Sequence, residues 1–115
     1  MADSQILKSY GIEYDSAIAR FAGNDALYLK FLNRYVSDNY IGMVTTVFDG
    51  EDPAAMDSEI HKLKGVAANL GLDEIASIAN KIMGLLRAGE IEKARGLLPE
   101  LSAADSRARE AIAKC

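Results

Sequence analysis

Apolar residues recur every three or four positions along most of this chain, which is the period of an amphipathic α-helix. The alternation typical of β-strands is almost absent, and two prolines and scattered glycines separate the helical segments. We therefore predict an all-α protein. The expected helices are a short one over about 15–22, a long one that follows Asn24 and ends before 49, and others over about 53–70, 73–88 and 90–113.

Local signals indicate where these helices begin and end. Asn24 and Asp52 are favourable N-cap residues, and Asp52 is followed by a proline suited to a first turn. Gly71 and Gly89 can adopt the left-handed conformation that ends a helix. Pro99 lies inside the last segment, where it removes a backbone hydrogen bond. We expect a bend there, not an end.

Each long segment carries one apolar stripe suited to a shared core. The stripes consist of Leu29, Leu32, Val36, Tyr40, Met43 and Val47; of Met56, Ile60, Leu63, Ala67 and Leu70; of Ile75, Ile78, Ala79, Ile82, Leu85 and Leu86; and of Ile91, Ala94, Leu98, Leu101, Ala104 or Asp105, Ala108 and Ile112. The expected architecture is an up-and-down antiparallel four-helix bundle with a short extra N-terminal helix. At this length, residues 1–115 are expected to form a single domain.

His61 is the only histidine of the chain, and its direction on the helix decides what it can do. Because helical residues turn by about 100° each, four residues fall within about 60° of His61 in projection: Lys64, Gly65, Ala68 and Leu72. The apolar stripe of the same helix projects to the opposite side. We therefore expect an exposed imidazole with a lysine and a glycine beside it.

The stretch over 61–71 reads HKLKGVAANLG. It resembles the H-x-L-K-G motif of histidine phosphotransfer (HPt) domains in bacterial phosphorelays. A weaker likeness over 21–32, together with a later helix that breaks at Gly89, extends the resemblance to nearly the whole chain. Val66 and Ile60 depart from the Ser and Ala common in the family. Both project to or near the buried side, so we expect them to alter packing and not chemistry.

A histidine that accepts phosphate needs an accessible neutral nitrogen, room for an in-line approach and positive charge near the moving oxygens. By resemblance, His61 is the expected phospho-acceptor, Lys64 stabilises the phosphate, and Gly65 keeps the approach open. The residues expected to bind the partner around this face are Lys62, Ala68, Asn69 and Leu72. For Asn69, a hydrogen bond within the bundle is the alternative role.

The resemblance implies a phosphorelay intermediate. His61 would accept the phosphoryl group of a phospho-aspartate on a receiver domain, such as that of a hybrid sensor kinase, and pass it to the aspartate of another response-regulator receiver. Mg²⁺ would be held by the receiver, so this chain is expected to need no metal or cofactor. We expect no autonomous kinase activity, since no glycine-rich phosphate loop precedes a helix.

Charge and cysteine content narrow the expected partners and location. The formal net charge is −4 and no basic block occurs, so we expect neither nucleic-acid binding nor direct membrane contact. The single cysteine, Cys115, allows no internal disulfide and no thiol pair for a metal. With no signal-like segment at the N-terminus, the cytoplasm is the expected location, and a monomer is the expected state.

Two other functions are open at this stage. The chain could be an HPt-like adaptor that docks on receivers without carrying phosphate. It could also be a small hydrolase in which His61 is a general base oriented by Asp57, one turn before it. We treat Asp57 as a solvated residue, with orientation of the His61 ring as the alternative.

Overall fold

The computed structural model describes residues 2–115, and in that part it contains eight helices and no strand. The helices are α1 (Ser4–Ser9), α2 (Tyr14–Arg20), α3 (Asp25–Asp38), α4 (Tyr40–Phe48), α5 (Pro53–Asn69), α6 (Asp73–Arg87), α7 (Ile91–Gly96) and α8 (Leu98–Lys114). The all-α prediction is confirmed. None of the helices within residues 2–115 combines the length and the apolar character that crossing a bilayer requires.

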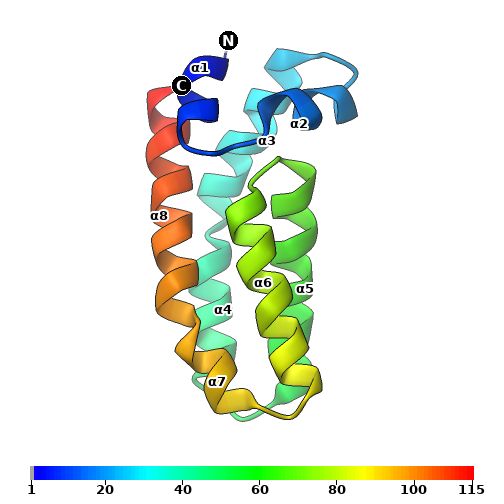
Figure 1. Ribbon diagram of the computed structural model, residues 1–115, viewed down its shortest axis with the longest axis vertical. Coiled ribbons are helices and arrows are strands. Elements are labelled where there is room, and N and C mark those ends of the chain that lie inside the picture. The colour runs from blue at the N-terminus through cyan, green and yellow to red at the C-terminus, as the bar shows by residue number, and fades with distance from the viewer. Residues whose placement is uncertain (1) are drawn as a thin grey trace.

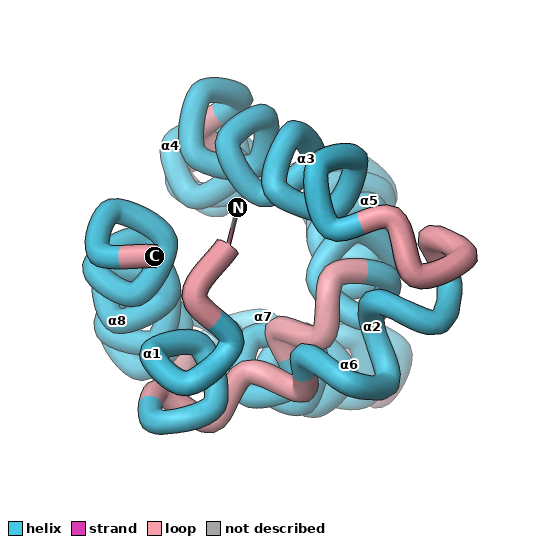
Figure 2. Tube along the Cα trace, turned by 90° about the horizontal axis from the view of Figure 1, so that it is seen from above, coloured by secondary structure: helices cyan, strands magenta, loops and turns pink. Residues whose placement is uncertain are grey.

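The helices form an elongated bundle of 42 × 23 × 20 Å. Figure 1 shows four parallel or antiparallel rods, made by α3 with α4, by α5, by α6, and by α7 with α8. Successive rods run in opposite directions, and α1 and α2 lie across the end where α5 turns into α6. Seen along the bundle in Figure 2, the rods surround a common centre. This is the helical bundle that the apolar stripes predict.

The inner faces of the rods supply the core. On α5, α6 and α8 the predicted stripes are buried, including Met56, Ile60, Leu63, Ala67, Ile75, Ile78, Ala79, Ile82, Leu86, Leu101, Ala104, Ala108 and Ile112. Asp105 is the one charged residue buried among residues 2–115. Its carboxylate accepts hydrogen bonds from the Tyr35 hydroxyl at 2.5 Å and from Arg109 Nε at 2.8 Å, so the buried charge is paired.

The prediction of one long second helix is wrong, because the helix is interrupted at Asn39 and forms α3 and α4. This residue adopts the left-handed conformation (φ 48°, ψ 58°), and its side-chain oxygen accepts a hydrogen bond from the Gly42 amide at 3.2 Å. Asparagine tolerates that conformation and caps the new helix. The core-facing residues also differ from the predicted stripe: on α3 Tyr28 and Tyr35 are buried, and on α4 Phe48 is buried whereas Met43 is 37% exposed.

Both ends of the chain also differ from expectation. The expected short helix over about 15–22 is present as α2, but another short helix, α1, precedes it. The last segment ends at Gly96 and restarts at Leu98, so the expected bend is a break. Pro99 then lies in the first turn of α8, where its missing N–H costs no intrahelical bond.

Candidate functional site

The helix that carries His61 is fixed at both ends. Asp52 accepts a hydrogen bond from the Ala54 amide at 3.0 Å, and Pro53 opens the first turn. At the other end Gly71 has the left-handed φ of 78° that the sequence predicts. Between these ends the apolar stripe is buried, which sets the rotation of α5 about its axis.

That rotation leaves His61 exposed, as the projection predicts. Lys64 lies one turn further along and is partly buried. Gly65 and Ala68 are exposed, and a Cβ built on Gly65 meets no atom within 4 Å. The surface around the imidazole therefore has no large side chain at Gly65 or Ala68 to obstruct an approaching partner, and Lys64 lies at its edge.

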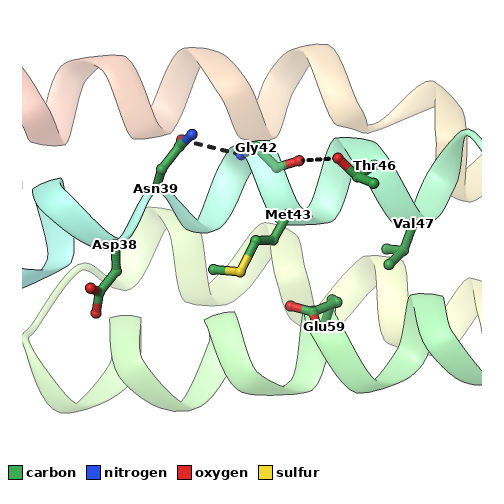
Figure 3. A pocket seen from close by; sticks show the side chains of 7 residues that line it. All are labelled: Asp38, Asn39, Gly42, Met43, Thr46, Val47 and Glu59. Atoms are coloured by element: carbon green, nitrogen blue, oxygen red, sulfur yellow. Dashed lines mark hydrogen bonds between the residues drawn. The ribbon is translucent and has the colours of Figure 1, made fainter.

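On the α4 side of this face, Lys62 and Glu59 form an ion pair of 3.3 Å. Glu59 also lines an open groove of about 500 Å³ between α4 and α5. In Figure 3 the carboxylate of Glu59 lies on the side of Met43 of α4 and points away from Val47. Lys62 is thus at the rim of the His61 face and is already paired, whereas Lys64 has no ion pair among the described residues.

The C-terminal end of α5 is covered by α2. Arg20 Nη1 donates hydrogen bonds to the carbonyl oxygens of Ala68 at 3.0 Å and Asn69 at 3.2 Å, which satisfies the free end of the helix. The exposed Asn69 also lines a second cavity, of about 250 Å³, between α3 and α5. Sequence reasoning missed Arg20, because no local pattern connects residues so far apart in the chain.

Leu72 does not belong to this surface, and its predicted contact with a partner is wrong. Its side chain is only 2% exposed. Helix α5 ends at Asn69, and the Leu72 amide folds back to donate a hydrogen bond to the Ala67 carbonyl at 2.9 Å. The projection assumed that the helix continues to residue 72, so it placed Leu72 on the wrong side.

Asp57 is not the solvated residue we expected. It is partly buried, and its Oδ1 atom is shielded from solvent without a hydrogen-bond partner in the described part of the chain. Three side chains therefore follow one another along α5: a carboxylate with an oxygen left unpartnered by the described residues, the exposed imidazole one turn later, and a lysine one turn after that. No group of three or more His, Cys, Asp or Glu side chains suited to hold a metal ion occurs within residues 2–115.

Comparisons with known proteins identify the family. No curated protein and no solved structure matches the chain. A family model, that of the Hpt domain, matches residues 30–111, well over half of the sequence, and its match includes α4 to α7 in full and the His61 motif. The chain therefore belongs to the Hpt-domain family, the helical phosphocarrier modules that serve histidine phosphotransfer in phosphorelays.

Proposed function

We propose that this protein is a phosphorelay intermediate that accepts a phosphoryl group on His61 from the phospho-aspartate of one receiver domain and passes it to the aspartate of another. The observation that carries the proposal is the exposed imidazole on α5, beside Lys64 and the open surface at Gly65, in a chain of the Hpt family. The receiver of a hybrid sensor kinase and those of response regulators are the proposed partners.

The residues of the face have separate roles in this proposal. The outer ring nitrogen of His61 attacks phosphorus, and the Lys64 ammonium offsets charge on the phosphoryl oxygens. Gly65 lets the receiver approach in line, because no side chain stands above that turn. Lys62, Ala68 and Asn69 form the docking rim, all three being exposed. We further propose that the protein acts as a monomer in the cytoplasm.

The test is transfer from a receiver domain phosphorylated with acetyl phosphate. Phosphate should appear on this chain in a form that is labile to acid and stable to alkali, as a phosphorylated imidazole is. His61→Gln should remain folded by circular dichroism and take up no phosphate. An adaptor that only docks would bind and signal normally with this substitution, so retained signalling by His61→Gln would contradict the proposal.

A further inference from the structure

One carboxylate oxygen of Asp57, Oδ1, is buried, but the fold of residues 2–115 provides no hydrogen-bond donor for it. A buried carboxylate oxygen without a donor costs free energy. Because such atoms are rare in folded proteins, we expect a donor near Asp57, which lies on the same helix as the reactive histidine. One candidate donor on the same helix is the imidazole of His61, one turn later.

The helix geometry brings these two side chains together. Residues four apart on an α-helix have Cβ atoms about 5–6 Å apart. Helical side chains lean towards the N-terminus, so the His61 ring lies over the turn that contains Asp57. In projection Asp57 is about 40° from His61, on the side of Lys64. No hydrogen bond joins them within residues 2–115, so forming one requires rotation of the two side chains about their own bonds.

Glu59 also has a buried oxygen without a partner among the described residues, but this side chain lies on a different side of α5 from His61. Its Oε2 is the other buried oxygen without a partner in the described chain. However, Glu59 projects about 160° from His61, and in Figure 3 its side chain lies in the groove between α4 and α5, on the side of Met43. Its second oxygen is paired with Lys62 at 3.3 Å. Glu59 therefore cannot serve the imidazole and is a matched control.

We propose that Asp57 is a positioning residue for phosphoryl transfer: its carboxylate accepts a hydrogen bond from Nδ1–H of His61 and leaves the Nε2 lone pair facing the partner. Nδ1 is the ring nitrogen nearer the backbone, so a carboxylate on the adjoining turn reaches it while Nε2 remains outermost. This inference rests on the proposed function of His61.

Phosphoryl transfer from the receiver's aspartate to His61 needs no further reactant. The Nε2 lone pair forms the N–P bond, the bond between phosphorus and the receiver's aspartyl oxygen breaks, and that carboxylate leaves with the electron pair. No proton is released, because Nδ1 keeps its hydrogen and the ring becomes cationic. The Asp57 carboxylate stabilises this cation, and the reverse step returns the phosphoryl group to a receiver.

The first test is the tautomer of His61 by ¹⁵N NMR, which gives a single imidazole signal set because the chain has one histidine. In alkaline buffer the neutral wild-type ring should be mainly Nδ1–H. Free histidine favours the opposite tautomer. Asp57→Ala should shift the ring towards Nε2–H, whereas Glu59→Ala should leave it unchanged.

The second test is the transfer rate at saturating phosphorylated receiver. Asp57→Ala should lower it about 10- to 100-fold, the range found when the hydrogen-bond partner that orients a metal-bound histidine is removed. The urea midpoint of this variant should fall no further than that of Glu59→Ala, because the one hydrogen bond lost involves an exposed imidazole and contributes little to stability. Glu59→Ala should transfer at the wild-type rate.

The outcomes separate the two proposals. If the wild-type protein takes no phosphate, the proposed function fails, while the tautomer measurement still decides the role of Asp57. If wild-type transfer occurs and Asp57→Ala leaves either the tautomer or the rate unchanged, the positioning role is wrong. A rate lost together with a urea midpoint well below that of Glu59→Ala would also overturn it, since the residue would then be structural.

Discussion

Lys62 and Lys64 are close in sequence but differ in what they can do for a phosphoryl group on His61. Lys64 is partly buried on the same side as the imidazole, three residues after it. Lys62 projects about 100° away, has half of its side chain exposed and is paired with Glu59. The two lysines therefore allow the effect of a charge at the reaction centre to be separated from that of a charge at the docking rim.

We predict that Lys64→Ala slows phosphoryl transfer at saturating receiver roughly tenfold. A hydrogen bond to a charged group contributes about 1.5–3 kcal/mol, and partial exposure places Lys64 at the lower end of this range. Lys62→Ala should instead weaken receiver binding and leave the saturated rate near that of the wild type. Single-turnover transfer over a range of receiver concentrations measures both. A tenfold loss of the saturated rate in Lys62→Ala alone would reverse the assignment.

Helical periodicity was sufficient to place the central residues of the site. His61, Lys64 and Gly65 all lie well inside α5, where a fixed turn per residue holds. Leu72 was misplaced because it lies past the end of that helix. The burial of Asp57 could not be predicted, since it depends on which neighbouring elements cover the edge of α5.

At the scale of elements, the turn between α5 and α6 is joined to the loop before α2. The Glu13 amide donates a hydrogen bond to the Gly71 carbonyl at 3.0 Å. Gly71 is buried with a positive φ, and a Cβ on it would lie 2.7 Å from the Glu13 carbonyl oxygen. Glycine is therefore required at this position for two reasons, its backbone conformation and the close approach of the loop.

Gly71→Ala should lower the free energy of unfolding by roughly 2–4 kcal/mol, from left-handed strain and the clash with Glu13. Gly84 is the matched control: it lies inside α6, is exposed, and an added Cβ meets nothing within 4 Å. Gly84→Ala should raise stability by about 0.5–1 kcal/mol. Urea unfolding of both variants measures this difference. Equal stability of Gly71→Ala and wild type would show that the loop moves away without cost.

The sequence predicted element ends where a local signal marks them. Asn24 caps α3 through a hydrogen bond from the Leu27 amide at 3.0 Å, and Asp52 caps α5 in the same manner. The breaks at Asn39 and Leu97 were not predicted, because apolar periodicity continues across both. Such breaks are decided by how the rods pack, which a single sequence does not display.

At the scale of the whole molecule, the N-terminal segment ties together the two rods that flank it. Asp25, at the start of α3, accepts hydrogen bonds from the Tyr14 hydroxyl at 2.7 Å and from the Ala2 amide at 2.8 Å. Lys114, at the end of α8, donates to the Tyr10 hydroxyl at 2.8 Å. Figure 1 shows α1 and α2 across this end of the bundle. These contacts join distant parts of the chain and had no signal in the sequence.

The pKa of Asp25 gives this connection a pH dependence. The hydrogen bond from Tyr14 lowers the Asp25 pKa most, and that from the Ala2 amide lowers it further. The folded state therefore binds a proton at this carboxyl less readily than the unfolded chain does. Its contribution to stability is complete above the unfolded Asp pKa of about 3.9, and it is lost as the pH falls through the lower folded value.

Asp25→Asn tests this dependence, because the amide cannot ionise. At neutral pH the variant should be roughly 1 kcal/mol less stable than wild type, the contribution of a partly exposed hydrogen-bonded carboxylate. The difference should shrink as the pH falls from about 3.9 through the lower folded pKa of Asp25, because the carboxyl then becomes protonated in the folded protein as well. Urea unfolding at several pH values measures it. Asp15→Asn, which removes an exposed pair with Lys8 of 3.1 Å, should change stability by less than about 0.5 kcal/mol throughout. A difference between Asp25→Asn and wild type that grows on acidification would contradict the direction of the Asp25 shift.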